Sequence, residues 1–237
     1  MKKTYLIKYC LISILTLFFA SCSNDDDNNN NIDYGLSTGN FLPLAVNNSW
    51  KYTVENQSDS YTTKIISAIQ FSGSTYYEFI GDGALDIGFD VTIKQFFGKK
   101  GATYLLKADE SKIDFNGIIA KLESYEIPIL RDDYEINKKW TGTLTPKFTF
   151  TGNGQSGTLP FKVDYKGENY YKGEITQNGI VYPNVIKTKV NITINANNQI
   201  STASEEYWFA ENIGIIKSIS ISDQINRTTI IESFNLF

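Results

Sequence analysis

The chain has 237 residues, with 22 basic and 26 acidic side chains and a formal net charge of −4. It therefore lacks the basic excess of proteins that bind nucleic acid or anionic membrane surfaces. It contains no histidine, two cysteines and one methionine, which excludes Ser-His-Asp and Cys-His catalysis and the usual zinc, copper and haem ligand sets. We expect one sizeable domain with no cofactor, no metal and no nucleic-acid partner.

Residues 1–21 have the three-part composition of a secretory signal. Three lysines precede an apolar run over residues 10–19, and the small residues Ala20 and Ser21 follow it. The apolar run is about half the ~20 residues that a helix needs to span a bilayer. The sequence therefore predicts a signal peptide rather than a permanent transmembrane helix.

Ala20-Ser21-Cys22 resembles the lipidation site of bacterial lipoproteins, although Phe19 stands where an aliphatic residue is preferred. The resemblance implies that Cys22 becomes the lipidated first residue of the mature chain and holds it in the outer membrane. The residues after it resemble the acidic export signal of surface lipoproteins of the Bacteroidota: Ser23, Asn24, Asp25, Asp26 and Asp27. The alternative is that this run is only a tether, because acidic, Asn-rich sequence cannot bury enough apolar surface to fold.

Residues 22–40 are thus expected to be a lipidated cysteine and a disordered tether, and residues 41–237 a folded domain. Apolar and polar residues alternate through 50–55, 61–71 and 185–194, with the two-residue period of half-buried strands. Asn178-Gly179 is the strongest hairpin signal. Further strands are expected near 74–80, 91–97, 103–107, 112–116, 144–151, 158–165, 169–177, 199–210, 213–222 and 227–234.

Two segments are less clear. Residues 118–125 fit a short helix or a strand, and their β-rich surroundings favour a strand. Pro128–Asn137 is expected to be a connection. About a dozen strands with turns between them predict an all-β, single-domain fold. We expect a strongly curled antiparallel meander sheet, a half-barrel or barrel, with little helix after the signal peptide.

Two motifs at the ends of the domain resemble a family. Phe41-Leu42-Pro43-Leu44 with Asn48-Ser49-Trp50-Lys51-Tyr52, and the later Tyr207–Lys217 segment, resemble the opening and closing motifs of uncharacterised Bacteroidota outer-membrane lipoproteins. That group is similar to the DUF3108-like proteins, whose curled sheet resembles periplasmic lipoprotein-localisation factors. Asn47 stands where the family has Gly, and Asn tolerates the same positive φ. The resemblance implies a fold and an envelope location but no catalytic residues.

Aromatic residues make up 14% of the chain and supply the candidate contact residues. Strand alternation sends one ring of each adjacent pair, Tyr76-Tyr77 and Tyr170-Tyr171, to each face of a sheet. We therefore take these four tyrosines and Trp208 as candidates for a binding surface. For the three tryptophans, Trp50, Trp140 and Trp208, a place in the core is the favoured interpretation.

Carboxylate clusters offer weaker candidates. The spacing of Asp82, Asp86 and Asp90 is wrong for a calcium loop and favours a hairpin tip. Asp132 and Asp133, with Glu135, could supply the two carboxylates of a hydrolase, which is a distant alternative.

The sequence therefore predicts a non-catalytic lipoprotein that is attached to the membrane through Cys22 and holds an apolar ligand on a curled β-sheet. The alternative is a surface module whose exposed aromatics bind glycan or another envelope protein.

Overall fold

A computed structural model describes residues 33–57, 60–81, 94–115, 117–222 and 225–237. Apart from Asp33, these residues belong to one compact unit, Tyr34–Phe237. Cys22 and the acidic run after it lie outside the described residues. Within the described ranges there is no helix long and apolar enough to cross a membrane. The regular elements there are all strands, as the sequence predicts.

Sixteen strands are found in the described part of the chain. In chain order they are β1 (Ser49–Val54), β2 (Ser60–Phe71), β3 (Ser74–Ile80), β4 (Gln95–Lys100), β5 (Thr103–Ala108), β6 (Ser111–Phe115), β7 (Ile118–Leu122), β8 (Tyr125–Arg131), β9 (Lys139–Leu144), β10 (Phe148–Gly152), β11 (Gln155–Leu159), β12 (Phe161–Gln177), β13 (Ile180–Ala196), β14 (Gln199–Ala210), β15 (Gly214–Ser222) and β16 (Asn226–Asn235).

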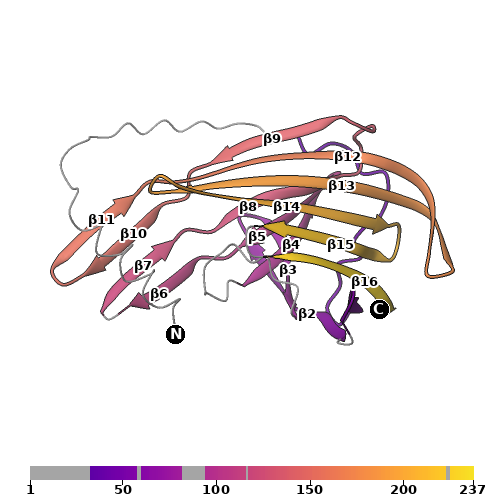
Figure 1. Ribbon diagram of the computed structural model, residues 1–237, viewed down its shortest axis with the longest axis horizontal. Coiled ribbons are helices and arrows are strands. Elements are labelled where there is room, and N and C mark those ends of the chain that lie inside the picture. Colours follow the sequence, from indigo (N-terminus) through magenta and orange to yellow (C-terminus); the bar gives the residue numbers. More distant parts are fainter. Residues whose placement is uncertain (1–32, 58–59, 82–93, 116, 223–224) are drawn as a thin grey trace. The chain divides into compact units, whose positions relative to one another are not determined.

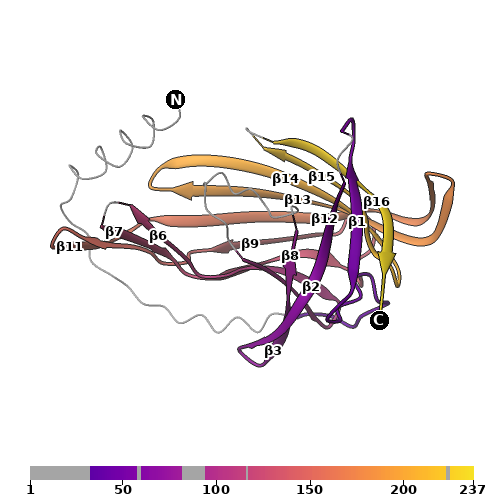
Figure 2. The ribbon, with the colours of Figure 1, turned by 90° about the horizontal axis from the view of Figure 1, so that it is seen from below.

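Twelve of these strands form one antiparallel sheet in the order β8-β5-β4-β3-β2-β1-β16-β15-β14-β13-β12-β9. The sheet curls until it is nearly closed, as Figures 1 and 2 show from two directions. Most neighbours in the sheet are neighbours in the sequence, and β1 joins the two halves by pairing with β16. The predicted curled antiparallel sheet is therefore confirmed.

The meander differs from the prediction in two ways. The strands expected near 158–165 and 169–177 form one continuous strand, β12, which runs from Phe161 to Gln177. The second difference concerns four strands of the meander. Strands β6, β7, β10 and β11 leave it and form a second, four-stranded sheet in the order β11-β10-β7-β6. This sheet projects from one end of the unit (Figure 1). Residues 118–122 are a strand within it, which confirms the preference for strand over helix there.

Turn chemistry fixes the register of the long hairpin. Asn178 and Gly179 have φ of +51° and +77° and connect β12 to β13. Consecutive positive φ values are those of a type I′ turn, whose twist matches that of the flanking strands. Asn47 has φ of +80°, so it takes the conformation that glycine would take in the opening motif.

Side chains, not backbone ladders, connect the two ends of the large sheet. The indole Nε1 of Trp140 on β9 donates to the Pro128 carbonyl on β8 at 3.0 Å. Asn169 on β12 donates through Nδ2 to the carbonyls of Arg131 at 2.7 Å and Tyr134 at 3.0 Å. We call these contacts the seam; they stabilise the curl where no strand pairing is found between the described β8 and β9.

The expected connection at Pro128–Asn137 was placed too early, because β8 continues to Arg131. Proline lacks a backbone N–H, so within a sheet it is confined to edge strands, to the first residue of a strand and to bulges. β8 is such an edge strand, and its proline carbonyl is used by the seam instead. The proline therefore marks the edge of the sheet rather than the end of the strand.

The opening motif near Trp50 and the closing motif near Gly214 meet in space. Trp50 on β1 is 1% exposed, and its Nε1 donates to the Ile213 carbonyl at 2.6 Å. Tyr52 donates to the Ile215 carbonyl at 2.9 Å. Gly214 has φ of +108° and lies against the Trp50 indole, where a Cβ would be crowded. The opening and closing motifs thus form one packed contact across β1, β16 and β15.

The segment before β1 packs into the curl, and we call Tyr34–Leu44 the strap. The Tyr34 carbonyl accepts from the Ala102 N–H at 2.8 Å, and Phe41 and Leu42 are each 2% exposed. They join a core cluster with residues of β5, β8, β13 and β14. Residues 34–40, which the sequence assigned to the tether, are therefore hydrogen-bonded to the compact unit.

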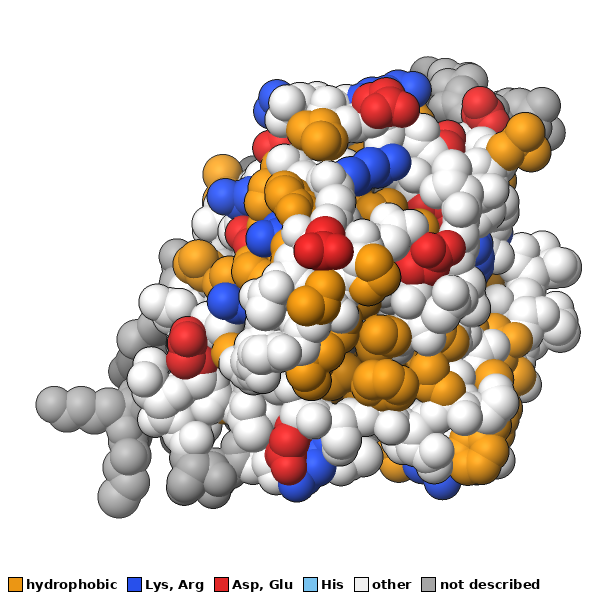
Figure 3. All heavy atoms as spheres, turned by 90° about the vertical axis from the view of Figure 1, so that its right-hand side faces the viewer, with side chains coloured by type: hydrophobic (Ala, Val, Ile, Leu, Met, Phe, Trp, Pro, Cys, Tyr) orange, Lys and Arg blue, Asp and Glu red, His pale blue; other side chains and the backbone are white. Residues whose placement is uncertain are grey.

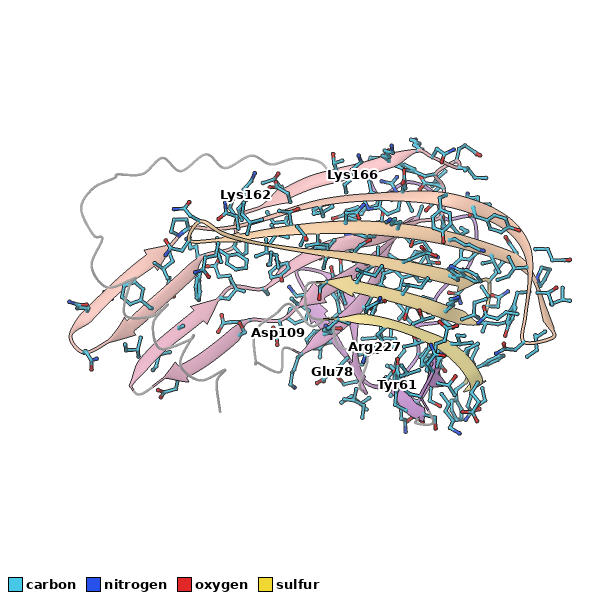
Figure 4. The ribbon with its side chains drawn as sticks, in the orientation of Figure 1. Tyr61, Glu78, Asp109, Lys162, Lys166 and Arg227 are labelled. Carbon is cyan, nitrogen blue, oxygen red and sulfur yellow. The ribbon has the colours of Figure 1, made fainter. Side chains whose placement is uncertain are left out.

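Replacing Gly167 on β12 by alanine tests the seam. A Cβ there would overlap the Trp140 indole, so we expect Gly167→Ala to lower the free energy of unfolding by about 1–3 kcal/mol. Urea denaturation measures the change. Lys166→Ala, at the exposed neighbouring position (Figure 4), is the control and should cost little.

The double variant Gly167→Ala, Trp140→Leu separates crowding from other causes. If the indole is what the new methyl meets, the double variant is less destabilised than the sum of its single changes. Additive costs would contradict this account of the seam.

Candidate functional site

A cavity of about 370 Å³ opens inside the curl of the large sheet. Its lining comes from the strap, from β1 to β5, and from β14 to β16. Figure 4 labels three of its lining residues: Tyr61 from β2, Glu78 from β3 and Arg227 from β16. Concave sites that mix an apolar lining with a few polar groups are the usual form of a small-molecule site.

Aromatic and aliphatic side chains form most of the lining. Phe79 stacks on Trp50 with ring centroids 5.7 Å apart, and it contacts Phe97 at 4.6 Å. Leu42 of the strap and Leu106 of β5 also line the cavity. These rings come from strands far apart in the sequence, and the curl brings them together.

The opposite wall is polar. Glu205 on β14, Ser220 on β15 and Arg227 on β16 stand opposite one another in the register of adjacent strands, so their side chains share the inner face. The Ser220 hydroxyl donates to Glu205 at 2.6 Å. In the next row Ser218 and Thr229 share a hydrogen bond of 2.6 Å. This wall therefore carries one carboxyl group, one guanidinium group and three hydroxyl groups.

Glu205 is the most perturbed carboxyl on this wall. It is 6% exposed, and burial raises its pKa to about 7, against the smaller lowering effects of Ser220 and Arg227. A carboxyl with a pKa near neutrality in a cavity is a functional-site candidate. At neutral pH this group exists in both its charged and its neutral form.

A second carboxylate, Glu78, lines the cavity from β3 and is ionically paired. Its Oε1 lies 2.9 Å from Lys94 Nζ, and Ser67 donates to Oε2 at 2.9 Å. The hydrogen bond from Lys94 holds the pKa of Glu78 below its usual range. The two cavity carboxyls thus differ in charge state at neutral pH.

Three of the five predicted contact residues come together on the other face of the sheet. Trp208 Nε1 donates to Glu206 at 2.9 Å and to the Tyr170 hydroxyl at 3.2 Å. Tyr170 also donates to Glu206. Lys187 Nζ lies 4.7 Å from the centroid of the Tyr171 ring. We call these five residues the outer cluster.

A β-bulge between Asn169 and Tyr171 explains why both rings of the Tyr170-Tyr171 pair lie in this cluster. The extra residue of a bulge breaks strand alternation, so the expected split of this pair between two faces does not occur. A bulge of this kind has no signal in the local sequence.

Lysines cover the rings of the outer cluster. Lys187 Nζ lies 3.5 Å from the Trp208 ring centroid, and Lys217 Nζ lies 4.8 Å from it. These lysines stand on the strands either side of Trp208. A sugar ring that stacked on this indole would have to displace a cation–π contact, worth about 0.5–1 kcal/mol when exposed.

Tyr76 and Tyr77 do not join the outer cluster. Tyr76 is 1% exposed and donates to Glu126, and Tyr77 packs against the core cluster that contains Trp50. Trp50 and Trp140 are buried, as expected, whereas Trp208 is only partly buried. The five predicted contact residues therefore do not form one site. Tyr170, Tyr171 and Trp208 lie in the outer cluster, whereas Tyr76 and Tyr77 lie elsewhere.

Asp132 and Asp133 have structural partners, whereas Glu135 is exposed. Asp132 is fully buried and accepts from Ser37 at 2.7 Å and from the Thr38 N–H at 2.9 Å. Asp133 pairs with Arg131 at 2.9 Å. Neither lines the cavity. In the described ranges no three His, Cys, Asp or Glu side chains gather to hold a metal; Asp82, Asp86 and Asp90 lie outside those ranges.

Exposed apolar side chains gather on one end of the unit, which Figure 3 shows face on. The β12–β13 hairpin, which extends to this end in Figure 1, exposes Ile180 by 54% and Val181 by 55%. These residues do not line the cavity.

The residues of the polar wall were not predicted from the sequence, although the position of Glu205 on β14 could have indicated one of them. Glu205 alternates with Tyr207 and Phe209 along β14, so it occupies an inward position in an apolar row. A charged residue at such a position is uncommon unless it serves a site. Arg227 and Ser220 gave no comparable signal.

No protein-family profile and no curated protein matches the chain. Two solved structures have similar folds. One is a candidate lipoprotein of Parabacteroides distasonis, 10% identical, with a TM-score of 0.47 over 83% of this chain and 99% of that one. The other is a candidate exported protein with a YmcC-like fold from Bacteroides fragilis, 9% identical, with a TM-score of 0.46 over the same shares.

Glu205 should make stability depend on pH. Its folded-state pKa of about 7 lies above the ordinary value of 4.5, so the folded chain binds more protons between these values. Its contribution to stability is therefore present below about pH 4.5 and lost as pH rises through about 7. We expect Glu205→Gln to be more stable than the native chain at about pH 8, by about 1–3 kcal/mol.

Urea midpoints at about pH 5 and pH 8 measure this difference. Glu174→Gln, at an exposed position of β12, is the matched control and should leave the pH profile unchanged. A Glu205→Gln profile parallel to the native one would contradict the shifted pKa.

Proposed function

We propose that this chain is a non-catalytic envelope lipoprotein whose β domain holds an apolar ligand in the cavity of the curled sheet. The observation that carries the proposal is the cavity itself, about 370 Å³ with a mainly aromatic and aliphatic lining. Burying apolar ligand surface there yields roughly 25 cal/mol for each Å² removed from water.

The two faces of β14 favour the cavity over the outer cluster as the binding site. On the outer face, Trp208, Tyr170 and Glu206 are bonded to one another, and Lys187 and Lys217 cover the indole. On the inner face the aromatic wall encloses a space large enough for a ligand. A ligand therefore displaces fewer existing contacts in the cavity.

The anchor belongs to the same proposal. Lipidation of Cys22 would attach the chain to the outer membrane, and the acidic run from Ser23 to Asp27 would direct it to the cell surface. The support is the sequence resemblance of Ala20-Ser21-Cys22 and of the run after it. The membrane is thus the expected partner of the N-terminal end.

A surface module that binds glycan or another envelope protein remains the second candidate. The convergence of Tyr170, Tyr171 and Trp208 favours it, because three aromatic side chains meet on one face. A carboxylate-based hydrolase has less support: Asp132 and Asp133 hold other parts of the chain, and Glu78 is paired with Lys94.

Filling the cavity distinguishes the two binding candidates. Ser218 lines the cavity, and a Trp at that position would occupy part of its volume. We expect Ser218→Trp to weaken binding of the neutral fluorophore N-phenylnaphthylamine at least about tenfold, a loss of about 1.4 kcal/mol. Fluorescence titration measures the affinity, and thermal unfolding checks that the variant folds.

Trp208→Ala is the matched control, because Trp208 lies on the face of β14 that points away from the cavity. This substitution should leave fluorophore affinity unchanged. If Trp208→Ala abolished binding while Ser218→Trp did not, the outer cluster would be the site and the cavity proposal would be wrong.

Cell fractionation tests the anchor. We expect Cys22→Ser to move the protein from the membrane fraction to the aqueous fraction, because the acyl chains supply the membrane affinity. Replacing Asp25, Asp26 and Asp27 by Ala should leave it in the membrane but protect it from protease added to intact cells. Equal digestion of the triple variant and the native chain would make the acidic run a tether only.

A further inference from the structure

The β12–β13 hairpin projects past the strand beside it and carries apolar side chains at its tip. Val185 of β13 pairs with Ala210, the last residue of β14, and the part of β13 before Val185 extends beyond that strand. Figure 1 shows the hairpin reaching past the end of the large sheet. Ile180 and Val181, which directly follow the turn, are each more than half exposed. We call these two residues the hairpin tip.

The hairpin tip continues into a larger apolar surface. Tyr182, the next residue of β13, packs in a core cluster against which Ile175, Ile213 and Leu236 lie partly buried. Figure 3 shows apolar side chains gathered on this end of the unit. A turn exposed to water needs no apolar side chains for its own folding, and contiguous apolar surface on a folded protein usually marks a contact site.

The strap runs along the same edge of the large sheet. The antiparallel registers place the β4–β5 turn, the β14–β15 turn and the β12–β13 turn at one edge. The Tyr34 carbonyl accepts from the Ala102 N–H beside the first of these turns, and the Asn40 carbonyl accepts from the Asn212 N–H in the second, at 2.6 Å. The chain before Tyr34 therefore joins the compact unit at the edge from which the hairpin projects.

We infer that the hairpin tip docks on the lipid bilayer that holds the Cys22 anchor, with Ile180 and Val181 at the boundary between headgroups and acyl chains. The inference rests on the lipidation of Cys22 in the proposed function and adds a membrane-binding surface on the folded unit. It does not depend on the cavity, whose lining includes neither residue of the tip.

The length of the tether favours a bilayer as the occupant. Residues 22–33 span at most about 40 Å when fully extended, so a lipidated Cys22 keeps this edge of the sheet close to the membrane. A short tether gives the second contact an effective concentration of about the millimolar range. A weak apolar contact is then populated on the anchored chain, although it is too weak to hold a chain without the acyl groups.

The tether itself is a poor cover for the hairpin tip. Residues 23–31 are all Ser, Asn or Asp, and polar side chains lose hydrogen bonds to water when they cover an apolar surface. A second copy of the chain is the competing occupant, and the measurements below distinguish it from lipid.

Fluorescence quenching on the native lipidated chain, in phosphatidylcholine vesicles, tests the inference. With Cys22 acylated and residues 1–21 removed, Val181→Cys supplies the one free thiol for the fluorophore NBD. Ile200→Cys is the matched control, because Ile200 is 67% exposed beside the β13–β14 turn at the opposite edge of the sheet. We expect nitroxide-labelled lipid to quench the probe at Val181 at least about threefold more than the probe at Ile200, because docking brings the tip about 5–10 Å into the bilayer.

A charge at the tip assigns the effect to the apolar surface. In the chain labelled through Val181→Cys, Ile180→Asp should reduce quenching to the level of the Ile200 probe, because a carboxylate is costly to move into lipid. Ile200→Asp in the same labelled chain is the control and should leave quenching unchanged. Flotation with the vesicles should persist in both variants, since the acyl groups hold them, and thermal unfolding checks that each one folds.

The outcomes separate this inference from the proposed function. If the native chain does not float with vesicles, the anchor is wrong and docking falls with it, while the cavity proposal stands. If the chain floats but both probes are quenched equally, or Ile180→Asp has no effect, docking alone is wrong. If the probe at Val181 is shielded from iodide in water but not quenched by nitroxide lipid, a second copy covers the tip and the inference is also wrong.

Discussion

The curl of the twelve-stranded sheet is the constraint on which the rest of the structure depends. A twisted sheet of this size cannot stay flat, and bending brings its end strands toward each other. Here the ends are β8 and β9, and they are joined by Trp140 and Asn169 side chains rather than by a ladder. The curl encloses an interior that other parts of the chain fill.

Two segments fill that interior from different directions. The strap inserts Phe41 and Leu42 against β5, β13 and β14, and the Trp50 indole packs against Gly214 with its Nε1 on the Ile213 carbonyl. Both contacts join residues far apart in the sequence. The cavity is the part of the interior that the strap and the Trp50 indole leave unfilled. Leu42 of the strap and Trp50 form part of its lining.

The sequence predicts the strands well because alternation and turn residues are local signals. The Asn178-Gly179 turn and the period-two pattern of β13 place that hairpin without any knowledge of its partners. It could not predict that β6, β7, β10 and β11 leave the meander, because which strand pairs with which depends on long-range packing. The bulge that puts Tyr170 and Tyr171 on one face is invisible for the same reason, and so is the row of Glu205, Ser220 and Arg227 from three different strands.

The two faces of β14 carry carboxyls in different surroundings. Outward, Glu206 accepts bonds from Tyr170 and Trp208, so its charge is compensated by fixed neighbours at the surface. Inward, Glu205 is removed from water with one hydroxyl bond and a nearby guanidinium, and burial still dominates its pKa. A buried carboxyl that its surroundings compensate only in part lowers the stability of the folded state above neutral pH. Packing alone does not require such a group, since an apolar side chain would fill the same position at lower cost.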